Sequence, residues 1–240
     1  MNKESNFSGV LFPEFNSTIT EQKDCLEHKS SGVKRYKRML NLHLHNSFPV
    51  EGADDMPLLC PFDKQLPASF IPFSERNKKQ YILGVHCYLY DYFIEPIWNS
   101  PKTFLSQLRK YRCVIAPDYS IFVDQPQILN KWNVYRNRWV ASYWQANHIN
   151  VIPSASWGNV DSFKYCFDGL PENSVIAIGH CATGKDIAYK KLYRMGVEAL
   201  IERKHPSKLL VYGFPLDFNV DVETFYIESK IQLLRKINRK

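Results

Sequence analysis

Val175-Ile176-Ala177-Ile178 is an uninterrupted run of four apolar residues between Ser174 and Gly179. A strand with one face in water alternates apolar and polar residues, whereas an unbroken apolar run is typical of a strand covered on both faces. Two-sided burial is what parallel strands packed between helices require. Three further runs have the same character: Val114-Ile115-Ala116, Val151-Ile152 and Leu209-Leu210-Val211.

Strand-like and helix-like segments alternate along the chain from residue 81 onward. This order predicts an α/β fold, mainly a parallel sheet built from about five consecutive strand–helix units with right-handed crossovers. The pattern fits both an open sheet and an incomplete TIM-like barrel. The predicted strands are 81–90, 113–116, 150–154, 174–178 and 208–212, and the predicted helices are 93–111, 127–147, 161–167, 186–204 and 223–237.

The first 67 of the 240 residues differ from the rest of the sequence. They scatter Asn, Ser, Gly and Pro among short apolar pieces, and Pro57, Pro61 and Pro67 favour an extended chain. We therefore predict an irregular N-terminal arm over residues 1–67 that packs on an α/β domain over residues 68–240.

Composition excludes several classes of protein. With 45% hydrophobic and 23% charged residues, the chain is not wholly disordered. No apolar run approaches the roughly 20 residues of a membrane-spanning helix, and the start lacks the pattern of a secretory signal. Six cysteines without C-x-x-C spacing indicate reduced thiols rather than a zinc site. We expect a cytoplasmic protein with no membrane partner.

The positive charge is concentrated in part of the chain. Lys and Arg number 31 against 24 Asp and Glu, a net charge of +7, and residues 101–150 carry seven basic and two acidic groups. A basic stripe favours contact with the phosphates of nucleic acid. A solvated surface explains the same pattern.

The residues after the strands are the candidates for chemistry, because ligands of parallel α/β sheets bind at the carboxyl ends of the strands. Asp91 and Asp118 follow the first two predicted strands and form a candidate acid/base pair, for which Mg²⁺ is an open alternative as cofactor. His180 directly follows another strand and is the third catalytic candidate. For a single Asp, a helix cap is the more common role at such a position, and a structural role is also the more common one for a histidine like His180. No dedicated metal site is predicted.

Five further residues are candidates for substrate binding: Ser120, Arg136, Trp157, Lys185 and Tyr212. Arg136 belongs to a polar and aromatic cluster, where it fits an anionic substrate or an ion pair with Asp118 or Asp124. Lys185 is the last residue of the segment Gly179 to Lys185, and this segment nearly matches the motif of a phosphate-binding loop. Asp186 stands where that motif needs a hydroxyl for Mg²⁺, so only a weaker anion-holding role is expected.

Several of these segments occur together in one known family. The segments Gly84 to Tyr92 with Trp98-Asn99, Ala116 to Ser120, Tyr135 to Trp139, Val151-Ile152-Pro153 with Trp157, Phe167 to Pro171, and Val211-Tyr212-Gly213 resemble the bacterial and phage family called domain of unknown function 4417. The resemblance covers about residues 68–215. Its members often occur in phages and mobile elements of Gram-positive bacteria, which implies, by analogy, a role in replication, host takeover or defence.

The sequence is compatible with three functions. The first is binding or processing of nucleic acid or a nucleotide at the carboxyl edge of the sheet. The second is a non-catalytic module that contacts a host or phage protein, with the N-terminal arm as one route to a partner. The third is a small-molecule enzyme of sugar or nucleotide type.

Overall fold

The computed structural model describes residues 39–44, 48–180 and 186–229 together with residue 232. The chain divides into two compact units, residues 1–47 and 48–240. The described part of the first unit contains a short 3-10 helix, η1 (Leu42–Leu44). The rest of the fold belongs to the second unit, which carries all the strands of the described residues.

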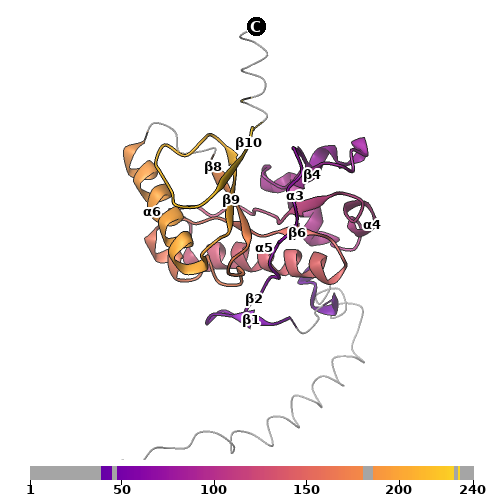
Figure 1. The fold of residues 1–240 in the computed structure, drawn as a ribbon. Helices are drawn as coiled ribbons and strands as arrows, with labels where there is room; N and C mark the ends of the chain where they lie inside the picture. Colours follow the sequence, from indigo (N-terminus) through magenta and orange to yellow (C-terminus); the bar gives the residue numbers. More distant parts are fainter. Residues whose placement is uncertain (1–38, 45–47, 181–185, 230–231, 233–240) are drawn as a thin grey trace, which may run out of the picture. The chain divides into compact units, whose positions relative to one another are not determined.

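The second unit alternates strands and helices along the chain (Figure 1). Its strands are β1 (Val50–Glu51), β2 (Met56–Pro57), β3 (Phe70–Pro72), β4 (Gly84–His86), β5 (Cys113–Ile115), β6 (Val151–Ile152), β7 (Ser154–Ala155), β8 (Val175–His180), β9 (Lys208–Gly213) and β10 (Thr224–Ile227). Its helices are η2 (Phe73–Lys78), α3 (Asp91–Asn99), α4 (Leu105–Leu108), α5 (Gln127–Ala146), η3 (Val160–Lys164) and α6 (Ile187–Lys204).

The strands from β3 to β10 form two parallel four-stranded sheets in sequence order, β3-β4-β5-β6 and β7-β8-β9-β10. Pro153 separates the two sheets, since it lies between β6 and β7. A proline has no N–H for a ladder hydrogen bond, so regular pairing stops there. Its carbonyl oxygen still accepts a hydrogen bond of 2.8 Å from the Ala177 N–H of β8. One bent segment, residues 151–155, therefore joins the sheets.

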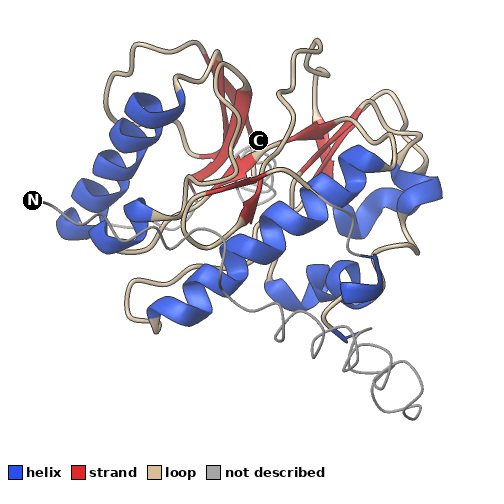
Figure 2. Cartoon of the chain, turned by 90° about the horizontal axis from the view of Figure 1, so that it is seen from below, coloured by secondary structure: helices blue, strands red, loops and turns tan. Residues whose placement is uncertain are grey.

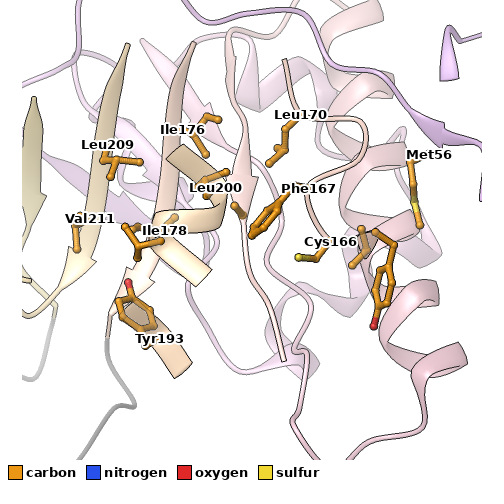
Figure 3. Close-up of a cluster of buried hydrophobic side chains, with 14 residues drawn as sticks. Met56, Cys166, Phe167, Leu170, Ile176, Ile178, Tyr193, Leu200, Leu209 and Val211 are labelled. Carbon is orange, nitrogen blue, oxygen red and sulfur yellow. The ribbon is translucent and has the colours of Figure 1, made fainter. Parts of the chain in front are cut away.

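Alternate residues of the strands enter two different cores. On β8, Ile176 and Ile178 pack with Leu200 of α6 in one cluster, which Figure 3 shows. Val175 and Ala177 enter a second cluster, where they meet residues of the first sheet such as Ile115. The helices cover the side of the strands that carries the first cluster, with Ile176 and Ile178 (Figure 2). The second side is buried because the two sheets contribute to one shared core.

The predicted parallel α/β architecture is confirmed, and all five predicted strands are present, but they are divided between two sheets and do not form one. The structure also decides between the open sheet and the barrel. Among the described strands, β3 and β10 each pair on one side only, so the sheets are open and no barrel closes.

The closing helix predicted over residues 223–237 is wrong at its start. Residues 224–227 form β10, which runs parallel to β9 in the register Thr224↔Leu209. Thr-Phe-Tyr-Ile is rich in β-branched and aromatic residues, which favour strands. Burial of Ile227 in the shared core stabilises this choice. Apart from residue 232, the remainder of the predicted helix from residue 230 onward lies outside the described residues.

Two other predicted helices are shorter than expected. The segment 93–111 is divided into α3 and α4, and α3 ends at Asn99, just before Ser100-Pro101. A residue before proline is disfavoured in the helical conformation, which explains the break. The segment 161–167 is the 3-10 helix η3, whose cap is the Asn159 side chain accepting the Ser162 N–H.

Residues 48–67 contribute to the second unit. The β1–β2 hairpin pairs Val50 with Pro57, and Met56 and Phe62 are buried in the two core clusters. The role of residues 1–67 as an arm, and its boundary at residue 67, stay predictions. Within the described residues, no helix combines the length and the apolar character that crossing a bilayer requires.

A buried arginine ties α5 to the second sheet. Arg138 is 2% exposed, and its guanidinium donates hydrogen bonds to the backbone oxygens of Asp168 (2.9 Å), Ser154 (2.9 Å) and Cys166 (2.7 Å). The Ser154 hydroxyl in turn donates to the Pro117 oxygen at 2.9 Å. This chain of bonds links the helix to the segment that follows β5.

Gly196 gives a direct test of how α6 packs. A Cβ at this position would lie 2.1 Å from Trp157 Nε1, far closer than any real contact. Alanine in a helix interior normally stabilises by about 1 kcal/mol relative to glycine. Here we expect Gly196→Ala to destabilise by about 1–3 kcal/mol, because the indole must move. Urea unfolding followed by tryptophan fluorescence measures both the change in stability and the displacement of the Trp157 indole. A stabilised variant with an unchanged spectrum would contradict the packing, and Met195→Ala serves as the control on the same helix.

Candidate active site at the carboxyl edge of the strands

The ends of β4, β5, β7, β8 and β9 bring one group of polar and aromatic side chains together. We call this group the Asp118 site. Its members come from residues that sequence analysis put forward and from others that it did not: His86, Tyr88, Asp91, Asp118, Ser120, Ser156, Gly179 and Tyr212.

Asp118 is the central residue of this site. It is half-buried, three residues beyond β5, and its Oδ1 atom is buried without a hydrogen-bond partner among the described residues. Burial raises the pKa of this carboxyl to about 7. A hydrogen bond from Ser156 opposes that rise, and the Asp91 carboxylate adds to it. Near neutral pH, Asp118 is therefore divided between its protonated and ionised forms.

Aromatic rings and one glycine lie beside Asp118. A Cβ on Gly179 would lie 3.3 Å from the Tyr88 ring and 4.0 Å from Asp118 Oδ2, so the glycine allows the β8 backbone to pass close to the Tyr88 ring. The Tyr88 and Tyr212 rings stack with centroids 4.7 Å apart, and His86 lies 4.6 Å from Tyr212. These rings join the end of β4 to the end of β9, although the two strands belong to different sheets.

His86 is neutral in this surrounding. It is 5% exposed, and burial lowers its pKa to about 4. Its Nδ1 atom is buried without a hydrogen-bond partner within the described part of the chain. The imidazole therefore presents a neutral ring and contributes no positive charge to the site.

Asp91 fixes the two loops that flank Asp118. Its carboxylate accepts a hydrogen bond of 2.8 Å from the Ser120 hydroxyl and bonds of 3.2 Å from the Ser120 N–H. Asp91 also begins α3. The structure thus brings Asp91, Ser120, Asp118 and Tyr212 together. In this state, Asp91 and Ser120 bind each other.

Arg136 lies apart from this group. Its guanidinium donates to Glu95 on α3 at 2.9 Å and to Asn133 at 2.7 Å, and it stacks 3.9 Å above the Tyr119 ring. The sequence left two roles open for Arg136, an anion-binding group or an ion pair with Asp118 or Asp124. The structure shows an ion pair, and the partner is Glu95. Sequence spacing gave no sign of Glu95, because α3 and α5 meet only in the fold.

His180 and Trp157 lie on the other side of β8. Successive residues of a strand point to opposite faces, so His180 points away from the side to which Gly179 belongs. The His180 Nδ1 atom is 2.9 Å from the Phe214 oxygen, and its ring stacks 4.5 Å from Tyr193 of α6. Trp157 packs on the same Tyr193 at 5.2 Å. His180 and Trp157 thus form a second group, and Arg136 belongs to neither group.

Lys185 lies outside the described residues, so the anion-holding role of its loop stays a prediction. Asp186, which follows it, caps α6 by accepting the Ala188 N–H at 2.8 Å. Among the described residues, no group of three or more His, Cys, Asp or Glu side chains has the arrangement of a metal site. Asp91 and Asp118 therefore lack a third such ligand there.

This geometry suits proton transfer. A carboxyl group with a pKa near 7 exchanges a proton efficiently at neutral pH. Its unpartnered oxygen can accept a hydrogen bond from a ligand when ionised and donate one when protonated. Four members of the site were not among the predicted site residues: His86, Tyr88, Ser156 and Gly179. Tyr88 and Ser156 also follow apolar strands, but aromatic and hydroxyl side chains in such loops are too common to single out.

A family model described as a domain of unknown function (DUF4417) matches residues 48–229. The chain belongs to this family. The match confirms the resemblance and extends it beyond residues 68–215 at both ends. It includes residues 48–67, which carry the β1–β2 hairpin and resemble no family on sequence inspection.

Two phage proteins are similar to the chain. It is 35% identical over 176 residues to the Gene 1 protein of Mycobacterium phage D29, which covers 72% of this chain and 65% of that protein. The Gene 1 protein of Mycobacterium phage L5 shows the same identity over 176 residues, and 76% of it is covered. The chain thus spans less than two thirds of the D29 protein. No solved structure matches. The expected link to phage proteins is confirmed.

Proposed function

We propose that the Asp118 site binds a small polar ligand with a nucleoside-type or sugar-type ring, and that Asp118 exchanges a proton with it. The observation that carries this proposal is the buried, unpartnered Oδ1 atom of a carboxyl group whose pKa is about 7. Keeping such a group costs stability, and perturbed carboxyl groups of this kind concentrate at functional sites.

The charges of the site favour this ligand over the phosphate backbone of nucleic acid. The Asp118 site has two carboxyl groups, Asp91 and Asp118, and no lysine or arginine among its members. The charge of Arg138 lowers the pKa of Asp118 in part, but its guanidinium is bound to three backbone oxygens. His86 stays neutral because its pKa is about 4. Arg136 is paired with Glu95. A polyanion needs cations at its contact points, whereas hydroxyl and ring nitrogen groups match carboxyl, hydroxyl and phenol partners.

Asp118→Asn provides the test of ligand binding. We expect a nucleoside or a monosaccharide to raise the unfolding midpoint of the full chain, by about 5–10 °C at a concentration near 100 times its Kd. Asparagine keeps the shape of aspartate but neither exchanges a proton nor carries a charge, so the shift should largely disappear. The measurement is a thermal-shift panel of nucleosides, nucleotides and monosaccharides at pH 6, 7 and 8.

Asp63→Asn is the matched control, because Asp63 is exposed and lies outside the site. Its thermal shifts should equal those of the unchanged protein. A panel that produces no shift, or equal shifts with and without Asp118, would reject the proposal. Binding of single-stranded DNA that weakens steeply with salt and survives Asp118→Asn would favour the nucleic-acid function instead.

A further inference from the structure

A hollow lies between the segment after β5 and the first turns of α6. Its volume is about 390 Å³, and it shares no residue with the Asp118 site. Six of its eight lining residues are apolar and two are carboxylic acids. The lining residues are Ile121, Phe122, Val123, Asp124, Asp186, Ala188, Tyr189 and Leu192. We call it the Phe122 hollow.

Large apolar side chains around this hollow face solvent. Phe122 is 54% exposed and Val123 is 43% exposed, and on the other wall Tyr189 is 37% exposed. Ile187, which lies between the lining residues Asp186 and Ala188, is 83% exposed. Single exposed apolar residues are ordinary, but a contiguous group of them is typical of a protein-binding surface.

The segment that carries Phe122 is held in place by a buried asparagine. Asn130 is fully buried, and its Nδ2 atom donates to the Phe122 oxygen at 2.9 Å while its Oδ1 atom accepts the Phe122 N–H at 3.2 Å. Ile121 packs against the core beside it. These two hydrogen bonds hold the Phe122 backbone in place, with its ring on the exposed side. A surface ordered before binding loses less entropy when a partner arrives.

The charge at the rim indicates the chemistry of the partner. Asp124 is exposed and makes no ion pair within the described residues, and the same is true of Asp186. They stand on opposite walls of an apolar hollow. In a protein of net charge +7, this is a local acidic rim. A lysine or arginine beside an apolar anchor complements both features.

We propose that the Phe122 hollow binds a segment of a protein partner in which an apolar side chain stands next to lysine or arginine. The apolar side chain enters between Phe122 and Tyr189, and the cation meets Asp124. This interaction surface is independent of the Asp118 site.

A displayed library of random 12-residue peptides, selected on the full chain, tests this proposal. Enriched peptides should carry an aromatic or aliphatic residue within two positions of lysine or arginine. A selected peptide, labelled for fluorescence anisotropy, should bind about tenfold or more weakly to Phe122→Ser, since anchor contacts dominate such interfaces. Asp124→Lys should weaken binding at low salt and less so at high salt.

Ile82→Ser is the control, because Ile82 is 82% exposed and lies before β4, away from the hollow. It should bind the peptide as the unchanged protein does. Selection of no peptide, selection of acidic peptides, or equal binding to Phe122→Ser would overturn the proposal. Self-association that Phe122→Ser abolishes, seen by sedimentation velocity, would instead assign the hollow to a second copy of the chain.

Discussion

Arg138→Met should lower the free energy of unfolding by about 3–5 kcal/mol, a large part of the 5–15 kcal/mol typical of a domain. The Arg138 guanidinium donates to three backbone oxygens, and its own exposure is 2%. Burial lowers its pKa to about 10, so it is still charged at neutral pH. Methionine fills much of the volume but leaves three buried oxygens without donors. Urea unfolding at pH 7 measures the loss.

Arg194→Met is the matched control. Arg194 lies on α6 with its side chain 56% exposed and paired with Glu198 four residues later. Exposed pairs of this type contribute about 0.3–0.5 kcal/mol, so the control should barely change stability. A loss below about 1 kcal/mol for Arg138→Met would contradict the role of Arg138 as the central link of this sheet. These contacts extend to the Asp118 site, because the Ser154 hydroxyl donates a hydrogen bond to the oxygen of Pro117, the residue before Asp118.

Asp118→Asn should stabilise the protein at alkaline pH. The pKa of this carboxyl rises from 3.8 to about 7 on folding, so between these values the native protein holds a proton that the unfolded chain releases. Stability therefore falls as pH rises through this window, and the full penalty is present above about pH 7. Because Asp118 is only half-buried, we expect the penalty to be about 1–3 kcal/mol rather than the full value of the shift.

The expected signature is a difference between two pH profiles. Midpoints of thermal unfolding from pH 4 to pH 8 should separate, with the variant gaining several degrees by pH 8 and little or nothing at pH 4. Asp63→Asn should follow the unchanged protein throughout. Parallel profiles for Asp118→Asn and the unchanged protein would show that folding leaves the pKa of Asp118 near its ordinary value.

The fold was predictable where a pattern repeats along the chain. Val175 to Ile178 and the other apolar runs identified parallel strands, since two-sided burial excludes polar alternation. The division at Pro153 was not predictable in the same way, because a proline at that point fits an edge or a strand end equally well. Thr224 to Ile227 was taken for helix, and its pairing with β9 is decided by tertiary contacts that local sequence does not report.

The candidate site was predictable in position more than in membership. The rule that ligands meet the carboxyl ends of parallel strands led to Asp91, Asp118, Ser120 and Tyr212, which the fold does bring together. The rule does not say which face of β8 a residue takes. His180 lies away from the others because it is on the face opposite to that of Gly179. Ion pairing also escapes sequence analysis, as the partner of Arg136 shows.

Carbon-13 NMR titration of the Asp118 side-chain carboxyl, assigned by comparison with Asp118→Asn, tests the central claim directly. We expect a midpoint near pH 7, about three pH units above the ordinary value of 3.8. A midpoint near pH 4 would show an ordinary solvated carboxylate, and would contradict both the proton exchange and the stability penalty assigned to Asp118.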